Sequence, residues 1–243
     1  MILAADYKCL EFGVASWLYN EPAMRAAYLS GDPHSVTARG LYGADTVTKD
    51  ERSVGKTANF SLLYKQGDAS FYSFGLKNGL RWTPEEAAEK RSAWLRLYPR
   101  VEPAWERIRE TAEETGYVET FSGRWRRLSE IKPSQIERVR RRAWRQACNA
   151  VVQTPAAEFA HVSAILATTQ HRELLGELIL HIHDALVFLV NGDLALEAAR
   201  MLRHVMEIET PEYYRQRLDR VIGIPLRVEI GVGPTWGDLS EVI

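Results

Sequence analysis

The sequence predicts an α+β fold, in which a small antiparallel sheet is separate from a helical region. Short apolar strands are expected at residues 2–6, 178–182, 185–190 and 226–232. Residues 17–130 read mostly as helices, so helices and strands are segregated along the chain rather than alternating. No repeat or low-complexity stretch interrupts the pattern. We therefore interpret the helical middle as an insertion between strands of one sheet.

Helix boundaries carry clear local signals. Asp32-Pro33 combines an N-cap residue with proline at the first helical position. Thr83 and Glu86 form a capping box, and Gly116 is typical of a helix C-cap. Helices are expected over residues 10–30, from 33, and over 50–64, 84–97, 102–115, 193–208 and 211–221. A long helix is expected from the capping box at 134–137 to about residue 170.

Two hairpins are expected. Residues 117–121 and 124–128 flank Ser122-Gly123, a typical turn pair. Further along, two apolar strands flank His183-Asp184, which predicts a tight, buried hairpin with a polar tip. Between the hairpins, residues 134–137 form a second capping box that opens the long helix to about residue 170.

Composition excludes several protein classes. The 243 residues carry a net charge of −1 and include only two cysteines, Cys9 and Cys148, too few for a disulfide framework or a Cys-rich zinc site. No apolar run approaches the ~18 residues of a membrane span, and the N-terminus lacks the features of a secretory signal. We expect a cytoplasmic protein without a membrane partner.

The near-zero charge hides an asymmetry. Residues 123–145 contain nine basic and two acidic side chains, a net charge of +7, so the rest of the chain carries −8. A basic block on an otherwise acidic protein indicates a polyanionic partner at one place.

Two aspartates follow apolar strands. Asp6 ends the first strand, and Asp184 lies at the tip of the second hairpin. Carboxylates at the ends of buried strands are costly unless they are paired or bind metal, so two adjacent strands would favour a two-metal phosphoryl-transfer site. An N-cap and a turn aspartate would explain the same residues.

Two helical stripes carry polar chemistry. Arg52, Lys56, Phe60 and Tyr64 recur every four residues, which suits a ligand with phosphates at one end and a flat base at the other. A solvated basic face beside core aromatics is the alternative. The second stripe, read as a nucleic-acid contact or as a solvated surface, consists of Arg138, Arg142, Arg145, Asn149 and Gln153.

In this order, the motifs resemble the C-terminal part of a family A DNA polymerase, the bacterial DNA polymerase I type. Residues 5–11 (ADYKCLE) are similar to motif A, and residues 52–64 (RSVGKTANFSLLY) to motif B. Residues 183–185 (HDA) are similar to motif C, usually HDE. The remaining similarities cover residues 32–43, 116–128, 145–153 and 225–233.

The resemblance implies a role for each motif. Asp6 and Asp184, with the backbone of Tyr7, would hold two Mg²⁺ ions, for which Mn²⁺ can substitute. Lys56 would act in catalysis and in binding the triphosphate. The other dNTP-binding residues would be Glu11, which would exclude a ribose 2′-hydroxyl, and His34, Arg52, Phe60 and Tyr64. Primer–template DNA would contact Arg142, Arg145, Asn149, Gln153 and His183.

The resemblance also implies an architecture. A palm with a small antiparallel sheet would comprise residues 1–16 and 131–243, and helical fingers would comprise 17–130. No thumb is expected in this chain, so we expect a protein partner that carries the thumb and the upstream palm. The expected activity is template-directed addition of dNTPs to a primer 3′ end, in a bacterial or phage-infected cell.

The sequence departs from the family pattern at motif C, where Ala185 replaces glutamate, and at motif B, where Ser61 and Lys65 replace the usual glycines. The Ala185 departure keeps an alternative open. The chain could be a catalytically weakened DNA- or nucleotide-binding module that acts as an assembly or regulatory part of a replication complex. A metal-dependent phosphohydrolase lacks a second His/Asp cluster in the sequence.

Overall fold

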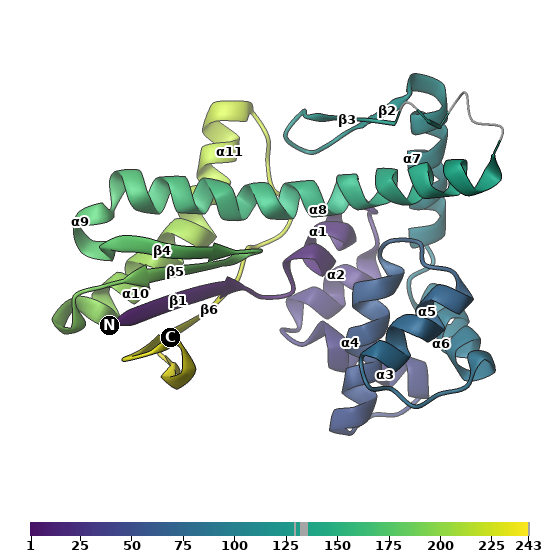
Figure 1. The fold of residues 1–243 in the computed structure, drawn as a ribbon, viewed down its shortest axis with the longest axis horizontal. Coiled ribbons are helices and arrows are strands. Elements are labelled where there is room, and N and C mark those ends of the chain that lie inside the picture. The colour runs from purple at the N-terminus through teal and green to yellow at the C-terminus, as the bar shows by residue number, and fades with distance from the viewer. Residues whose placement is uncertain (129, 132–135, 243) are drawn as a thin grey trace. The chain divides into compact units, whose positions relative to one another are not determined.

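A computed structural model describes residues 1–128, 130–131 and 136–242 (Figure 1). The chain divides into two compact units. Unit 1 comprises residues 1–10 and 153–243, and unit 2 comprises residues 11–152. Within the described part, no helix is both long enough and apolar enough to span a membrane.

Unit 1 is built on a five-stranded antiparallel sheet with strand order β4-β5-β1-β6-β7. The central strand β1 pairs with β5 on one side and β6 on the other, as Figure 1 shows. The strands are β1 (Ile2–Tyr7), β4 (Glu177–Ile182), β5 (Ala185–Leu189), β6 (Val228–Gly233) and β7 (Ser240–Glu241). The predicted strands are confirmed, and β7 is an addition.

Helices cover one face of this sheet. Leu3, Ala5 and Tyr7 alternate along β1 and are buried. The Tyr7 hydroxyl lies 2.7 Å from Ser163 Oγ and donates to the Met206 carbonyl at 2.9 Å, which fixes β1 to two helical segments. The helical elements are the second part of α8 (Glu137–Gln170), α9 (Arg172–Leu175), η1 (Gly192–Leu194), α10 (Ala195–His204), the π-helical turn η2 (Val205–Glu209), α11 (Thr210–Leu218) and η3 (Trp236–Asp238).

The hairpin of β4 and β5 forms as predicted, but the prediction that it is buried is wrong for β4. The side chains of β5 are mostly buried, whereas Leu180 and Ile182 on β4 are 41% and 42% exposed. The reason is that β4 lies at the edge of the sheet and carries an irregularity between Leu178 and Leu180. An apolar run alone does not distinguish an edge strand from a central one.

Unit 2 is helical, apart from the hairpin of β2 (Tyr117–Glu119) and β3 (Trp125–Arg127). The predicted caps are confirmed at Asp32, Thr83 and Gly116. The capping box expected at residues 134–137 includes residues outside the described ones. The helices are α1 (Leu10–Leu18), α2 (Pro22–Leu29), α3 (Pro33–Tyr42), α4 (Lys49–Leu62), α5 (Asp68–Lys77), α6 (Pro84–Leu97), α7 (Val101–Thr115) and the first part of α8.

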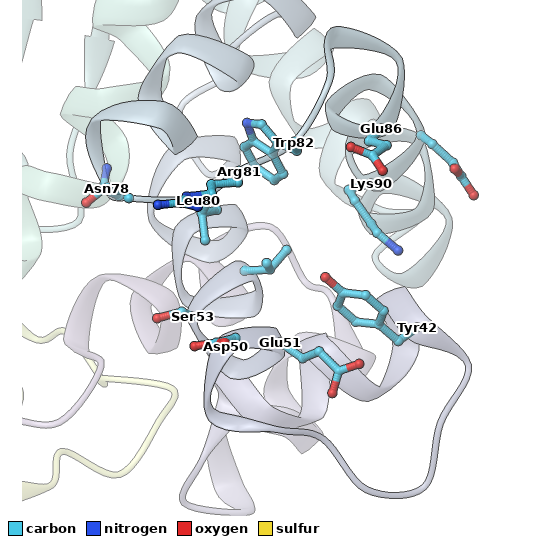
Figure 2. A pocket seen from close by; sticks show the side chains of 13 residues that line it. Tyr42, Asp50, Glu51, Ser53, Asn78, Leu80, Arg81, Trp82, Glu86 and Lys90 are labelled. Carbon is cyan, nitrogen blue, oxygen red and sulfur yellow. The ribbon is translucent and has the colours of Figure 1, made fainter.

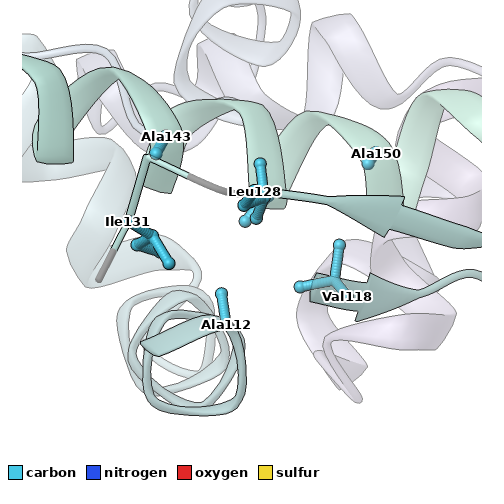
Figure 3. Packing of buried hydrophobic residues seen from close by; sticks show 7 residues of the cluster. Ala112, Val118, Leu128, Ile131, Ala143 and Ala150 are labelled. Atoms are coloured by element: carbon cyan, nitrogen blue, oxygen red, sulfur yellow. The ribbon is translucent and has the colours of Figure 1, made fainter. Parts of the chain in front are cut away.

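Two packing features of unit 2 position candidate site residues. Helices α3 and α4 approach so closely that a β-carbon at Gly55 would lie 2.3 Å from the His34 carbonyl oxygen. Separately, Val118 and Leu128 of the hairpin region are buried against small residues of α7 and α8 (Figure 3). Alanines at these helix positions let the hairpin pack tightly on the helices.

Candidate functional site

The strand register of unit 1 brings acidic side chains together. Asp6, next to last on β1, is the direct partner of Ala185 on β5 and of Glu229 on β6. Asp184 precedes Ala185 at the hairpin tip, and its carboxyl shares a hydrogen bond with that of Asp6. Cross-strand pairing, rather than proximity along the chain, therefore creates the carboxylate pair.

The surroundings of Asp6 disfavour a negative charge on its carboxyl group when Asp184 is also ionised. Partial burial, and then the carboxylates of Asp184 and Glu229, raise the pKa of Asp6 to about 7, while a hydrogen bond from the Tyr7 backbone N–H opposes the shift. The Asp6 side chain remains exposed to solvent, so burial removes only part of its hydration. A divalent cation would relieve this repulsion, and carboxylate oxygens are ligands that Mg²⁺ prefers. The donor set therefore fits the expected metal ion.

Glu229 does not complete a set of three ligands. Its carboxylate lies 3.0 Å from Lys8 Nζ in an ion pair. Within the described residues, no group of three or more His, Cys, Asp or Glu side chains is arranged to hold a metal ion. Ala185, where the family has glutamate, adds only a methyl group beside Asp6. The candidate metal centre therefore rests on two aspartates.

His183 occupies the turn of the same hairpin. Its backbone is left-handed, with φ of +54°, and its side chain is exposed. A non-glycine residue in this region is uncommon and is strained by the close approach of its β-carbon to the backbone. The turn thus presents His183 to solvent next to Asp184.

In unit 2, Arg52 on α4 binds Asp32, the N-cap residue of α3. Arg52 Nε and Nη2 donate to the two carboxylate oxygens at 2.9 and 3.2 Å. These bonds and those from Ser35 hold the pKa of Asp32 below its usual range, despite the opposing effect of partial burial. A phosphate that binds Arg52 would have to share the guanidinium with the Asp32 carboxylate or displace that carboxylate.

His34 is buried beside the same pair. Burial, then the positive charges of Arg52 and Lys56, lower the pKa of His34 to about 4, and Asp32 opposes them. The imidazole is therefore neutral at pH 7.

Neighbouring groups fix the tautomer of His34. Trp94 Nε1, which can only donate, bonds Asn59 Oδ1 at 2.9 Å, and this contact identifies the Asn59 oxygen. Asn59 Nδ2 must then donate to His34 Nδ1, 3.2 Å away. Because Nδ1 accepts, the proton lies on Nε2. The hydrogen bond from buried Trp94 to Asn59 thus determines that His34 carries its proton on Nε2.

Lys56 and Phe60 extend the stripe. Lys56 Nζ lies 5.8 Å from the centre of the Phe60 ring, and the His34 and Phe60 rings are also 5.8 Å apart. Lys56 forms no ion pair within the described residues, and Phe60 is 43% exposed. One surface of α3 and α4 therefore carries a cation, a neutral imidazole and an exposed aromatic ring.

Glu11 and Tyr64 come together as the resemblance implies. The Tyr64 hydroxyl donates to Glu11 Oε2 across 53 residues of sequence. Tyr64 lies just beyond the end of α4 rather than on the helix, so the stripe is helical only through Phe60. The contact places the Glu11 carboxylate beside the Tyr64 ring, with one oxygen already occupied by the tyrosine hydroxyl.

The second stripe lies on α8. Arg138, Arg142, Arg145 and Gln153 are exposed, and Asn149 is half-buried. The helix continues through Pro155 without ending. Lys132 of the basic block lies outside the described residues.

A separate pocket of about 770 Å³ opens in unit 2 (Figure 2). None of the predicted site residues lines it. Its charged residues are Asp50, Glu51, Glu86, Glu89, Arg81 and Lys90, so negative side chains outnumber positive ones. This balance disfavours a triphosphate, and we do not assign the pocket to the nucleotide.

Comparisons identify the family. The model for DNA polymerase family A matches residues 1–238. The chain belongs to DNA polymerase family A. It is 32% identical to "DNA polymerase I, thermostable" of Thermus filiformis and 30% identical to DNA polymerase I of Chloroflexus aurantiacus, over 99% of its own length. It spans 27% and 24% of these relatives, about a quarter of their length.

A solved structure of a DNA polymerase domain confirms the fold. The chain superimposes on the POL domain of Pol1 from M. smegmatis, solved in complex with DNA primer-template and dNTP, with a TM-score of 0.80 and 26% identity. The match covers 97% of this chain and 40% of that one. The α+β prediction and the resemblance are both confirmed.

Sequence reasoning missed three partners in these sites. It treated Asp32 only as a helix cap, although the same carboxylate holds Arg52. It gave no role to Asn59, which orients His34, or to Glu229, which faces Asp6. The sequence predicts a strand over residues 226–232, but only its register with β1 gives Glu229 this position.

Proposed function

We propose that this chain is the catalytic part of a template-directed DNA polymerase that adds dNTPs to a primer 3′ end by two-metal nucleotidyl transfer. The observation that carries the proposal is the contact between the Asp6 and Asp184 carboxyls, in a chain that matches the family A model over residues 1–238. As part of the proposal, residues 17–130 are fingers and the rest is palm.

In this proposal, Asp6 and Asp184, with the backbone carbonyl of Tyr7, would hold two Mg²⁺ ions, with Mn²⁺ as a substitute. When bound, the ions supply positive charge that activates the attacking hydroxyl and stabilises charge on the transferred phosphate. The chain itself contributes the closely spaced carboxyls, which the β1–β5 register preorganises. The Asp6 carboxyl, with its raised pKa, must lose its proton for this role.

Unit 2 would bind the nucleotide. Lys56 would contact the triphosphate as an unpaired cation and would contribute to catalysis. Neutral His34 would donate from Nε2, and Arg52 would exchange Asp32 for phosphate. Phe60 would pack against the incoming nucleotide.

Sugar selection would lie with Glu11 and Tyr64. A ribose 2′-hydroxyl would meet a carboxylate that is already occupied by the tyrosine hydroxyl. The clash would misplace the reacting phosphate rather than simply weaken binding.

Primer–template DNA would contact Arg142, Arg145, Asn149, Gln153 and His183. The exposed arginines would bind phosphates, and the amides would reach base edges. A protein partner or a further segment carrying the thumb and the upstream palm would complete the grip on duplex DNA.

Primer extension with the purified chain, Mg²⁺ and dNTPs tests the proposal, with and without the partner. Asp6→Ala and Asp184→Ala should each abolish incorporation while leaving the circular dichroism spectrum intact. Asp193→Ala, which removes an exposed aspartate of the same unit, is the matched control. Incorporation by both active-site variants at the wild-type rate would refute the assignment.

Ala185 favours a second function, a DNA- or nucleotide-binding module with weakened catalysis. Its methyl group lies opposite Asp6, where the family has a carboxylate. Binding of primer–template and dNTP without extension, even with the partner present, would support this function over the first.

A further inference from the structure

The hairpin of β2 and β3 carries an exposed aromatic stack. Trp125 is 58% exposed, the largest exposed fraction of any tryptophan in the described chain. Its ring lies against Tyr117, with centroids 4.6 Å apart and planes inclined by 22°. The register explains this contact, since Trp125 pairs with Glu119 and its diagonal neighbour is Tyr117. One broad face of an indole is thus supported from beneath while much of its surface remains in water.

The hairpin is held rigidly. Val118 and Leu128 are buried with alanines of α7 and α8, as Figure 3 shows. At the other end, the Phe121 ring packs edge-on against Trp17 at 4.6 Å. The turn closes with a hydrogen bond from the Gly123 N–H to the Thr120 carbonyl at 2.9 Å. The aromatic stack is therefore presented by a preorganised element, and Trp125 itself supports none of this packing.

Positive charge surrounds the stack. Arg124, Arg126 and Arg127 are exposed, against one carboxylate on the strands, Glu119. Arg127 pairs with Tyr117 across the hairpin, so it shares the aromatic face, while Arg126 lies on the other face with Val118. Arg126 and Arg127 form no ion pair within the described residues. An exposed aromatic face with adjacent arginines matches the chemistry of unpaired bases joined by phosphates.

We propose that this hairpin is a binding site for single-stranded DNA, in which an unpaired base stacks on Trp125 and the arginines contact the flanking phosphates. Duplex DNA would not use the platform, because its bases are already stacked on one another. The site extends the proposed polymerase function, since a template ahead of a primer is unpaired. It requires neither metal nor dNTP, so binding and primer extension can fail independently.

Fluorescence anisotropy of a labelled single-stranded oligothymidylate, titrated with the full chain without Mg²⁺, tests the site. Trp125→Ala should weaken binding about 5- to 150-fold, which corresponds to a loss of about 1–3 kcal/mol for one stacked base. Trp125→Phe, which keeps a ring, should retain most of the affinity. Trp236→Ala, which removes a 46% exposed tryptophan of unit 1, is the matched control and should leave binding unchanged.

Two further measurements separate stacking from charge. An abasic oligonucleotide of equal length should bind the wild type about as weakly as oligothymidylate binds Trp125→Ala. Arg127→Ala, which removes the arginine on the aromatic face, should reduce the slope of log affinity against log salt by about 1.

Three results would overturn the proposal. They are the absence of single-stranded DNA binding by the wild type, unchanged affinity in a folded Trp125→Ala variant, and equal binding of the abasic and thymidine oligonucleotides. The last two would show that phosphate contacts, rather than a base stacked on Trp125, carry the binding.

Discussion

Acidification from pH 7 to pH 5 should destabilise unit 2 through the single imidazole of His34. The side chain is 5% exposed, and its Nδ1 already accepts the Asn59 amide. Protonating His34 would break this hydrogen bond and place a cation near Arg52 and Lys56. The unfolded chain takes up the proton freely, so acid favours unfolding.

The sign and size follow from the pKa values. Because the folded pKa of about 4 lies below the unfolded value of 6.5, the contribution of His34 is fully present above pH 6.5 and is lost as pH falls towards 4. For these two values, linkage gives a loss of about 2 kcal/mol in unfolding free energy between pH 7 and pH 5.

Urea unfolding of the wild type and of His34→Gln at both pH values measures this loss. Glutamine can still accept from Asn59 but does not titrate, so His34→Gln should lose about 2 kcal/mol less than the wild type on acidification. All other titrating groups are common to both proteins. Equal losses in the two proteins, or a His34 pKa near 6.5 by NMR titration, would refute the reasoning.

Three further outcomes are expected. Ser61→Ala should raise the unfolding free energy by about 1 kcal/mol in urea titrations, because the buried Ser61 hydroxyl has no hydrogen-bond partner within the described residues. Gly75→Ala should lower the melting temperature and cost about 1–3 kcal/mol, because the added carbon would lie 1.8 Å from the Trp82 ring. Glu11→Ala should increase ribonucleotide incorporation relative to deoxynucleotide incorporation in single-turnover assays, because it removes the carboxylate that would clash with a ribose 2′-hydroxyl.

The first two of these predictions have a matched control. Ser73→Ala removes an exposed hydroxyl that bonds only its own helix, and should change stability little. Gly67→Ala adds a carbon that meets nothing within 4 Å. For the third prediction, an unaltered ratio of ribonucleotide to deoxynucleotide incorporation in Glu11→Ala would contradict the role of this carboxylate.

Local signals predicted much of the fold. The caps at Asp32, Thr83 and Gly116 depend on contacts within a few residues, and all three form as expected. Helix α5 (Asp68–Lys77) was not predicted, since its N-cap, Gly67, makes no side-chain capping bond. The prediction that β4 is buried was wrong, because the position of a strand at the edge of a sheet depends on the pairing of the whole sheet.

The candidate site was predictable in its residues but not in its connections. Family motifs indicated Asp6, Asp184 and His34, yet their chemistry depends on long-range neighbours. Glu229 reaches Asp6 only through strand register, and Trp94 orients His34 only through Asn59. Contacts between residues far apart in the chain produce no periodic pattern in the sequence, so they could not be predicted from it.

The missing side chain at Gly55 has a consequence for redesign. Helix α4 carries Arg52 and Lys56. Its close approach to α3 requires that residue 55 have no β-carbon. Any side chain at residue 55 would push the helix away from His34. If α4 were transplanted into another protein, α3 would therefore have to be transplanted with it. Mutational libraries over this helix should keep glycine at residue 55.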